Sequence, residues 1–226
     1  QGIVEAVESA FHFGFPLDAG AVLLIEVDGL EQAAIEEGEK IAKICTESGA
    51  REVRSANSPQ ERLLLWKCRK QAFGAIGRLS PSYCTQDGVV PRTKLPEILD
   101  FISACGERHG IRIVNVFHAG DGNIHPILLF DERNQEQVQR VLHASDEILN
   151  ECIRLGGSVT GEHGIGVEKI SFMEKLFSKE DLAMFVRVRT AFNPTGLCSP
   201  AKMLPTAGGC GMEMIERAHP SRQAAM

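Results

Sequence analysis

The sequence predicts an α+β fold, in which helices cover one face of an antiparallel or mixed sheet. Amphipathic segments with the periodicity of helices alternate with short apolar segments of strand character. Glycine, asparagine or proline residues mark most of the boundaries between these segments. The connections are short, and the element order β-α-β-α-β-α-β-β-α includes two consecutive strands that favour a hairpin.

Composition is that of a globular protein. The 226 residues can bury a substantial core in one large domain or two small ones. The net charge of −6, with scattered lysines and arginines, argues against a nucleic-acid partner. The longest apolar run, residues 19–25, is too short for a transmembrane segment. The seven cysteines contain no CxxC pair and predict buried, reduced thiols of a cytosolic protein. Because Gln1 lies at the edge of a predicted helix, we expect a fragment of a longer protein.

The first third of the chain alternates between helices and strands. The predicted elements are a helix over residues 3–10, a buried strand over 21–27, a helix over 31–48, a strand over 51–55 and a helix over 59–77. Gly49 ends the second of these helices. Asn57 or Ser58 can cap the third, with Pro59 at its first position.

The remaining elements fall into two groups. Up to residue 157 the sequence predicts a strand over 85–90, a helix over 95–109, strands over 111–117 and 124–130, and a helix over 134–155. A glycine-rich loop then leads to a helix from Ser178 or Asp181 to Ala191. We therefore expect a domain over 1–157, a C-terminal loop and helical segment over 158–206 with little core of its own, and a flexible tail over 207–226.

Two histidines flank a dense turn signal between the two consecutive strands. His118 and His125 enclose a Gly-Asp-Gly-Asn segment. Directly opposed residues of a hairpin have Cβ atoms roughly 5 Å apart, which would allow both imidazoles to bind one metal ion. A histidine pair with a carboxylate is typical of a catalytic zinc site. Glu162, in a loop with glycines at 161, 164 and 166, is the natural third ligand.

His163 follows Glu162 directly. Adjacent residues on extended backbone point to opposite sides, so we expect Glu162 on the metal and His163 as a general base. The alternative for any one histidine is a solvated or core-packed side chain. That alternative is preferred for His12, His109, His143 and His219.

Arginines on the helix over 59–77 are candidates for substrate binding. Arg69 lies near Trp66 and is either solvated or turned toward the site, where it would bind a carboxylate in bidentate fashion. Arg92 is a weaker candidate for the same role. The chain contains no Walker loop, GxSxG motif or Rossmann fingerprint.

Six motifs in this order resemble the C-terminal half of the FAD-linked 2-hydroxy-acid dehydrogenases. That family includes the FAD-binding subunit of bacterial glycolate oxidase and the D-lactate and D-2-hydroxyglutarate dehydrogenases. The resemblance covers roughly residues 1–206. Its motifs are Trp66 to Arg69, Asp87 to Arg92, His118 to His125, Gly161 to Gly166, Asn193 to Gly196 and Lys202 to Pro205.

The resemblance implies a ferredoxin-like substrate domain and a helical segment that returns to a flavin domain. His118, His125 and Glu162 would bind a divalent metal, often zinc, and His163 would take the proton of the substrate hydroxyl. The α-hydrogen would leave as a hydride to the flavin N5, while the metal lowers the pKa of the substrate oxygen. The remaining implied contacts are Arg69 with the substrate carboxylate and Lys202 with the cofactor.

Departures from the family pattern refine these expectations. Phe73, Thr85 and Ile127 stand where the hydroxyglutarate enzymes bind a distal carboxylate, which favours a small 2-hydroxy acid such as glycolate or D-lactate. Ser199 stands where the family usually has asparagine near the flavin. FAD would be bound mostly by a domain absent from this chain, so we expect the chain alone to bind no FAD tightly and to turn over no substrate.

The implied partners are the FAD domain and other oxidase subunits, in the cytoplasm or peripheral to the inner membrane through those subunits. Two other functions stay open. The chain could be a non-catalytic binding or assembly module of the same fold, or a flavin-independent metal hydrolase with a His-His-Glu site.

Overall fold

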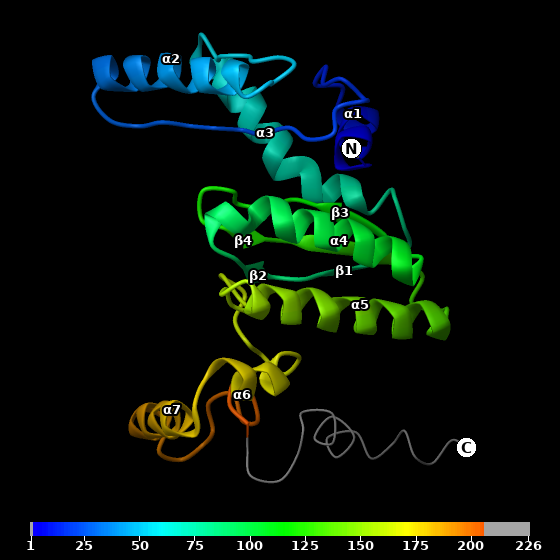
Figure 1. Cartoon of the computed structure of the whole chain (residues 1–226), viewed down its shortest axis with the longest axis vertical. Helices are drawn as coiled ribbons and strands as arrows, with labels where there is room; N and C mark the ends of the chain where they lie inside the picture. The colour runs from blue at the N-terminus through cyan, green and yellow to red at the C-terminus, as the bar shows by residue number, and fades with distance from the viewer. Residues whose placement is uncertain (1, 206–226) are drawn as a thin grey trace. The chain divides into compact units, whose positions relative to one another are not determined.

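The structure, a computed structural model, describes residues 2–205; the predicted tail over 207–226 lies outside them. It divides into two compact units, residues 1–79 and residues 80–226, each described here by itself. Figure 1 gives the element order. Helices dominate, and the strands form small antiparallel sheets, which confirms the predicted α+β class.

The first unit contains the helices α1 (Gly2–Phe11), α2 (Glu31–Glu47) and α3 (Pro59–Ile76). The hydroxyl of Ser58 accepts a hydrogen bond from the Glu61 amide, and Pro59 begins α3, as the sequence predicts. The strands predicted over 21–27 and 51–55 are wrong, because neither segment pairs with a neighbour in the described chain. An apolar segment of strand character needs partners for its backbone before it becomes a strand.

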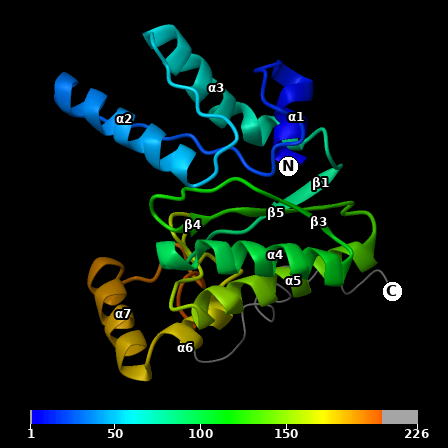
Figure 2. The same cartoon turned by 45° about the horizontal axis from the view of Figure 1, so that its top comes forward.

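The second unit contains an antiparallel sheet in the order β1 (Ser82–Thr85), β5 (Pro126–Phe130) and β3 (Arg112–Asn115). Figure 2 shows α4 (Leu95–His109) and α5 (Gln135–Arg154) together beneath one face of this sheet. The chain order β1-α4-β3-β5-α5 with this strand order matches the first five elements of the ferredoxin-like β-α-β-β-α-β pattern, and no sixth strand follows α5 in the described residues. The residues between the sheet and the two helices form the core: Val90, Ile98, Ile102, Cys105, Ile111, Ile124, Leu128, Val141, Ala144, Ile148, Cys152 and Leu155.

Two strands that the sequence predicts as continuous are interrupted. The segment over 85–90 breaks at Gln86 and Asp87, and β2 (Gly88–Val89) pairs with β4 (Asn123–Ile124) instead of β5. Single bridges join Val89 to Ser158 and His118 to Asn123. β2 and β4 therefore form a small sheet of their own next to the two histidines. The bridge between Val89 and Ser158 brings the loop that follows α5 beside β2.

After α5 the chain forms a loop, two short turns (η2, Ile170–Phe172; α6, Met173–Leu176) and α7 (Lys179–Phe192). Ser178 and Asp181 form a reciprocal cap at the start of α7. No residue of α7 is buried, and Val188 and Phe192 are among its exposed apolar side chains. Within residues 2–205, no helix combines the length and the apolar character that a membrane span requires.

The six described cysteines are all free thiols, in line with the absence of CxxC spacing. Only Cys105 and Cys152 are buried, and Cys198 is exposed, so the expectation of uniformly buried thiols is wrong. Burial raises the pKa of Cys152 to about 12 and that of Cys105 to about 11, with nearby carboxylates adding to the effect. Cys210 lies outside the described residues.

Candidate metal centre

The loop between β3 and β5 holds both histidines of the predicted site. His118 forms an isolated β-bridge with Asn123, in which the His118 amide donates a hydrogen bond to the Asn123 carbonyl at 2.9 Å. The two histidines are therefore not directly opposed in a simple hairpin. Their rings nevertheless lie 5.6 Å apart between centroids, in an edge-to-face arrangement. The predicted proximity of His118 and His125 is confirmed, although through a different pairing.

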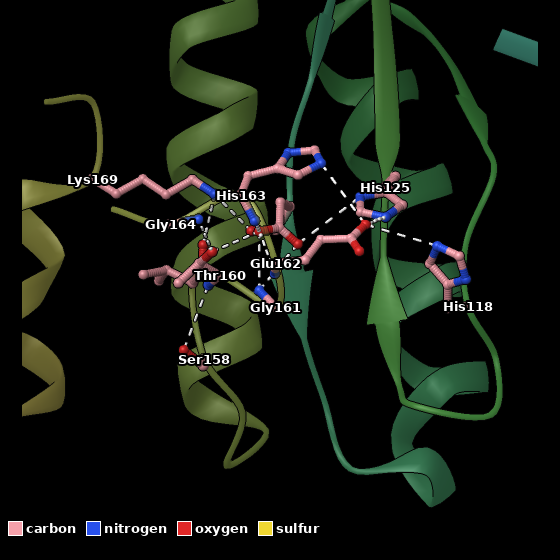
Figure 3. A network of polar contacts seen from close by, with 11 residues as sticks. His118, His125, Ser158, Thr160, Gly161, Glu162, His163, Gly164 and Lys169 are labelled. Atoms are coloured by element: carbon pink, nitrogen blue, oxygen red, sulfur yellow. Dashed lines mark hydrogen bonds and ion pairs between the residues drawn. The ribbon is translucent and has the colours of Figure 1, made fainter. Parts of the chain in front are cut away.

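Glu162 reaches the same place from the loop after α5. Its Oε1 lies 2.9 Å from His125 Nε2 and 3.8 Å from His118 Nε2. One donor atom from each of the three side chains lies within 4.8 Å of the other two. In Figure 3 the three side chains point toward one another across the two loops. Two imidazoles and one carboxylate are the donor set of a three-ligand divalent-metal site with an open position.

His125 is the most enclosed member of this group. Its side chain is 2% exposed, whereas those of His118 and Glu162 are about half exposed. Burial lowers the pKa of His125, while the charges of Asp87 and Glu162 act in the opposite direction. Its Nδ1 has no hydrogen-bond partner among the described residues and lies 3.9 Å from Asp87 Oδ1. A buried imidazole whose Nε2 faces Glu162 is placed to bind a metal ion, but its Nδ1 lacks, within residues 2–205, the hydrogen bond that usually orients a ligating histidine.

His163 lies on the same side of the loop as Glu162, and the roles expected for the two residues stay predictions. Its Nε2 is 3.8 Å from Glu162 Oε1, and its ring stacks on that of His125 at 5.1 Å between centroids. The reason is that residues 161–163 form a bend and are not extended. His163 is half exposed and reaches solvent beside the three-residue group.

Three further residues hold this loop in place, and none of them was predicted as a site residue. Asp87 is fully buried and accepts four hydrogen bonds from the Thr160 hydroxyl and from successive amides of the loop. The Lys169 ammonium, also buried, donates to the carbonyls of Asp87 and Val159 at 2.7 Å each. The sequence signals for Asp87 were a charged residue within a predicted strand and its place at the start of the motif Asp87 to Arg92.

Asn123 packs under the loop as the third such residue. A Cβ atom at Gly161 would lie 2.6 Å from the Asn123 side chain, so only glycine fits there. Asn123 is buried, and its Oδ1 has no hydrogen-bond partner in the described part of the chain.

The other predicted contacts lie elsewhere. Arg69 is on α3 in the first unit, with its guanidinium carbon 5.8 Å from the Phe73 ring centroid, so its role stays a prediction. Lys202 lies in the loop after α7, where its carbonyl accepts a hydrogen bond from Arg189 at 2.5 Å. Arg189 also binds the Ser199 carbonyl, so the backbone of this loop is fixed while the Lys202 side chain is exposed.

A second group of possible ligands consists of Cys105, His109 and Glu147. Arg108 donates to Glu147 Oε2 at 2.7 Å, and His109 Nε2 lies 2.8 Å from Glu147 Oε1. Hydrogen bonds from Arg108 and His109 lower the pKa of Glu147. The carboxylate is thus already neutralised, and a cation would compete with the adjacent guanidinium. This group is an ion-pair cluster between α4 and α5, in line with the non-ligand assignment of His109.

Comparison with protein families now places the chain. The family model described as "FAD linked oxidases, C-terminal domain" matches residues 3–203. The chain belongs to this family. Membership of the FAD-linked oxidases confirms the resemblance found in the sequence motifs.

Curated members of the FAD-linked oxidase family include close relatives of the chain. It is 42% identical over 207 residues to "Glycolate oxidase subunit GlcD" of Escherichia coli (strain K12), which covers 92% of the chain and 42% of that protein. The Bacillus subtilis subunit of the same name is 36% identical, over 90% of the chain and 43% of that protein. "D-lactate dehydrogenase [cytochrome], mitochondrial" of Arabidopsis thaliana is 26% identical, over 85% and 34%. The chain thus spans less than half the length of these relatives.

Proposed function

We propose that the chain is the substrate-binding and metal-binding part of an FAD-dependent dehydrogenase that oxidises a small 2-hydroxy acid to the 2-oxo acid. The observation that carries this proposal is the convergence of His118, His125 and Glu162, with His163 beside them, in a member of the FAD-linked oxidase family. The names of the relatives favour glycolate or D-lactate as the substrate.

In this reaction each of the site residues would have a separate role. His118, His125 and Glu162 would hold the divalent metal, and their nitrogen and oxygen donors suit zinc. His163 would receive the hydroxyl proton. When bound, the metal would polarise the substrate oxygen and the flavin would accept the hydride. Arg69 would bind the substrate carboxylate through its planar guanidinium.

The choice of a small substrate has support from the sheet. Thr85 on β1 and Ile127 on β5 are directly opposite each other, and Ile127 is fully buried. An apolar side chain at this position offers no hydrogen bond or charge to a second carboxylate. We therefore expect the site to prefer monocarboxylic 2-hydroxy acids over dicarboxylic ones.

The flavin domain is proposed to pack against the segment over 158–206. On α7, apolar side chains that include Phe185, Val188 and Phe192 line an open hollow together with Lys202. A contiguous exposed apolar surface on a helix favours packing against another protein surface. Other oxidase subunits are further candidate partners, in keeping with the word "subunit" in the names of two relatives.

Turnover by the joined protein tests the proposal. The chain is fused behind the flavin domain of a GlcD relative, and the yellow, flavin-loaded product is assayed for dye reduction. Glycolate or D-lactate should reduce the dye, and D-2-hydroxyglutarate should do so at least about 10-fold less efficiently. The chain alone should be colourless and inactive. A flavin-loaded fusion that turns over none of these acids would contradict the proposal, as would turnover by the chain alone.

Replacement of His163 by glutamine should separate proton transfer from metal binding. In the fusion, His163→Gln is expected to lower kcat by about 100- to 10 000-fold, because glutamine cannot accept the hydroxyl proton. Metal content should stay at the wild-type level, since the three proposed ligands are unchanged. Steady-state kinetics measure kcat, and metal analysis of the purified fusion measures its metal content. Equal loss of metal and turnover would instead assign His163 to the metal.

A further inference from the structure

We infer that Asp87 is the positioning residue of the metal centre, fixing the backbone that carries Glu162 and His163. This inference rests on the proposed function of the site and adds to it a residue that touches neither metal nor substrate. Its support is a set of hydrogen bonds between Asp87, in the break between β1 and β2, and residues of the loop after α5 that lie 73 to 76 positions later in the sequence.

The Asp87 carboxylate accepts hydrogen bonds from several donors of the loop after α5. Its Oδ2 accepts from the Thr160 hydroxyl at 2.6 Å, the Gly161 amide at 3.0 Å, the Glu162 amide at 3.2 Å and the His163 amide at 2.9 Å. Three successive amides that face one anion form a concave backbone nest. This arrangement sets the direction in which the Glu162 and His163 side chains leave the loop.

The environment of Asp87 keeps it ionised. Burial acts to raise the pKa of Asp87, but the Thr160 hydroxyl and the three amides outweigh it and lower the pKa to about 2. A side chain without an acceptor oxygen at the Oδ2 position would lose all four of these bonds. The acceptor oxygens of Asp87 therefore hold the bend, and their negative charge strengthens each bond.

Lys169 links Asp87 to the start of the same loop through two backbone carbonyls. Its ammonium bridges the carbonyl of Asp87 and the carbonyl of Val159, immediately before the nest. The Thr160 hydroxyl also accepts a hydrogen bond from the Gly164 amide at 2.8 Å, which fixes the end of the loop. Figure 3 shows Lys169 and Thr160 at the base of the loop whose Glu162 faces His125.

Asp87 also lies behind the buried ligand. Its Oδ1 is 3.9 Å from His125 Nδ1, the ring nitrogen that faces away from Glu162. This separation is longer than a hydrogen bond. It nevertheless places the buried Asp87 carboxylate next to both parts of the centre, His125 and the loop that carries Glu162.

The inference is tested on the full chain with Co²⁺ as the metal probe and with amide hydrogen exchange as a metal-independent readout. In the wild type, the amides of residues 161–163 should be protected from exchange. Asp87→Leu, which removes both acceptor oxygens, should expose them and weaken Co²⁺ affinity by about 10- to 100-fold, with a changed visible absorption spectrum of any bound Co²⁺.

Three milder variants distinguish a loss of loop positioning from a general loss of stability. Thr160→Val removes one bond to Asp87 and should weaken Co²⁺ binding several-fold, whereas Thr160→Ser keeps the hydroxyl and should restore wild-type affinity. Ile148→Val, in the core between the sheet and α5, lowers stability away from the site and should leave Co²⁺ affinity unchanged.

The possible results separate this inference from the proposed function. Wild-type Co²⁺ affinity or wild-type amide protection in Asp87→Leu would overturn the inference, and so would equal effects of Ile148→Val and Thr160→Val on affinity. A wild-type chain that binds no Co²⁺ would contradict the proposed metal site, while hydrogen exchange would still decide whether Asp87 holds the loop.

Discussion

His125→Ala is expected to lower the affinity of the chain for Zn²⁺ or Co²⁺ by at least about 100-fold. Zinc sites with four ligands bind with roughly 12 kcal/mol, or about 3 kcal/mol for each ligand. His125 is the most constrained member of the group, because its ring is 2% exposed and its Nε2 lies 2.9 Å from Glu162.

Competition with a chromophoric chelator measures this affinity. His143→Ala is the matched control, since His143 lies exposed on α5 and its removal should leave the affinity within about 2-fold of wild type. An unchanged affinity in His125→Ala would contradict the assignment of the site. A similar loss in His143→Ala would show that binding is not specific to the three residues.

Gly122→Ala is expected to destabilise the second unit by about 3 kcal/mol or more and to disturb the histidine loop. Gly122 has φ +73°, and a Cβ atom there would lie 2.1 Å from the Val90 carbonyl oxygen. That carbonyl belongs to backbone and cannot rotate away. The left-handed conformation costs an alanine about 1–2 kcal/mol, and relief of the clash adds a similar amount.

Urea denaturation of the variant and of Gly120→Ala provides the measurement. Gly120 lies two residues away in the same turn, with open space around its Cβ position, so its replacement should change stability by less than about 0.5 kcal/mol. Gly122→Ala should also weaken metal binding, because Gly122 separates His118 from His125. Equal stability of the two alanine variants would contradict the tight approach of β2 to this turn.

The helices could be predicted from the sequence to within a few residues, because each combines local periodicity with local end signals. The predicted helix over 95–109 matches α4, and Ser58 caps α3. Strands depend on partners that are distant in the sequence. The segment over 21–27 has strand composition and yet forms no strand, and Asp87 divides the segment over 85–90 between two sheets.

In the candidate site, too, local features could be predicted from the sequence and features set by distant residues could not. The spacing of His118 and His125 around a turn was sufficient to predict their proximity, because it is a local property. The orientation of Glu162 and His163 was not predictable, since it follows from a bend held by a carboxylate more than 70 positions earlier in the chain. Lys169 carries no signal in the sequence, because its burial results from the packing of two separate loops.

A titration of the wild-type chain with Co²⁺ tests the central claim, a divalent-metal site formed by His118, His125 and Glu162, most directly. Visible absorption bands of Co²⁺ bound by nitrogen and oxygen ligands should rise linearly and saturate at one equivalent, and Zn²⁺ should then remove them. Glu162→Gln should abolish the saturable signal. Absence of saturable binding in the wild type, or saturation that persists in Glu162→Gln, would contradict the account.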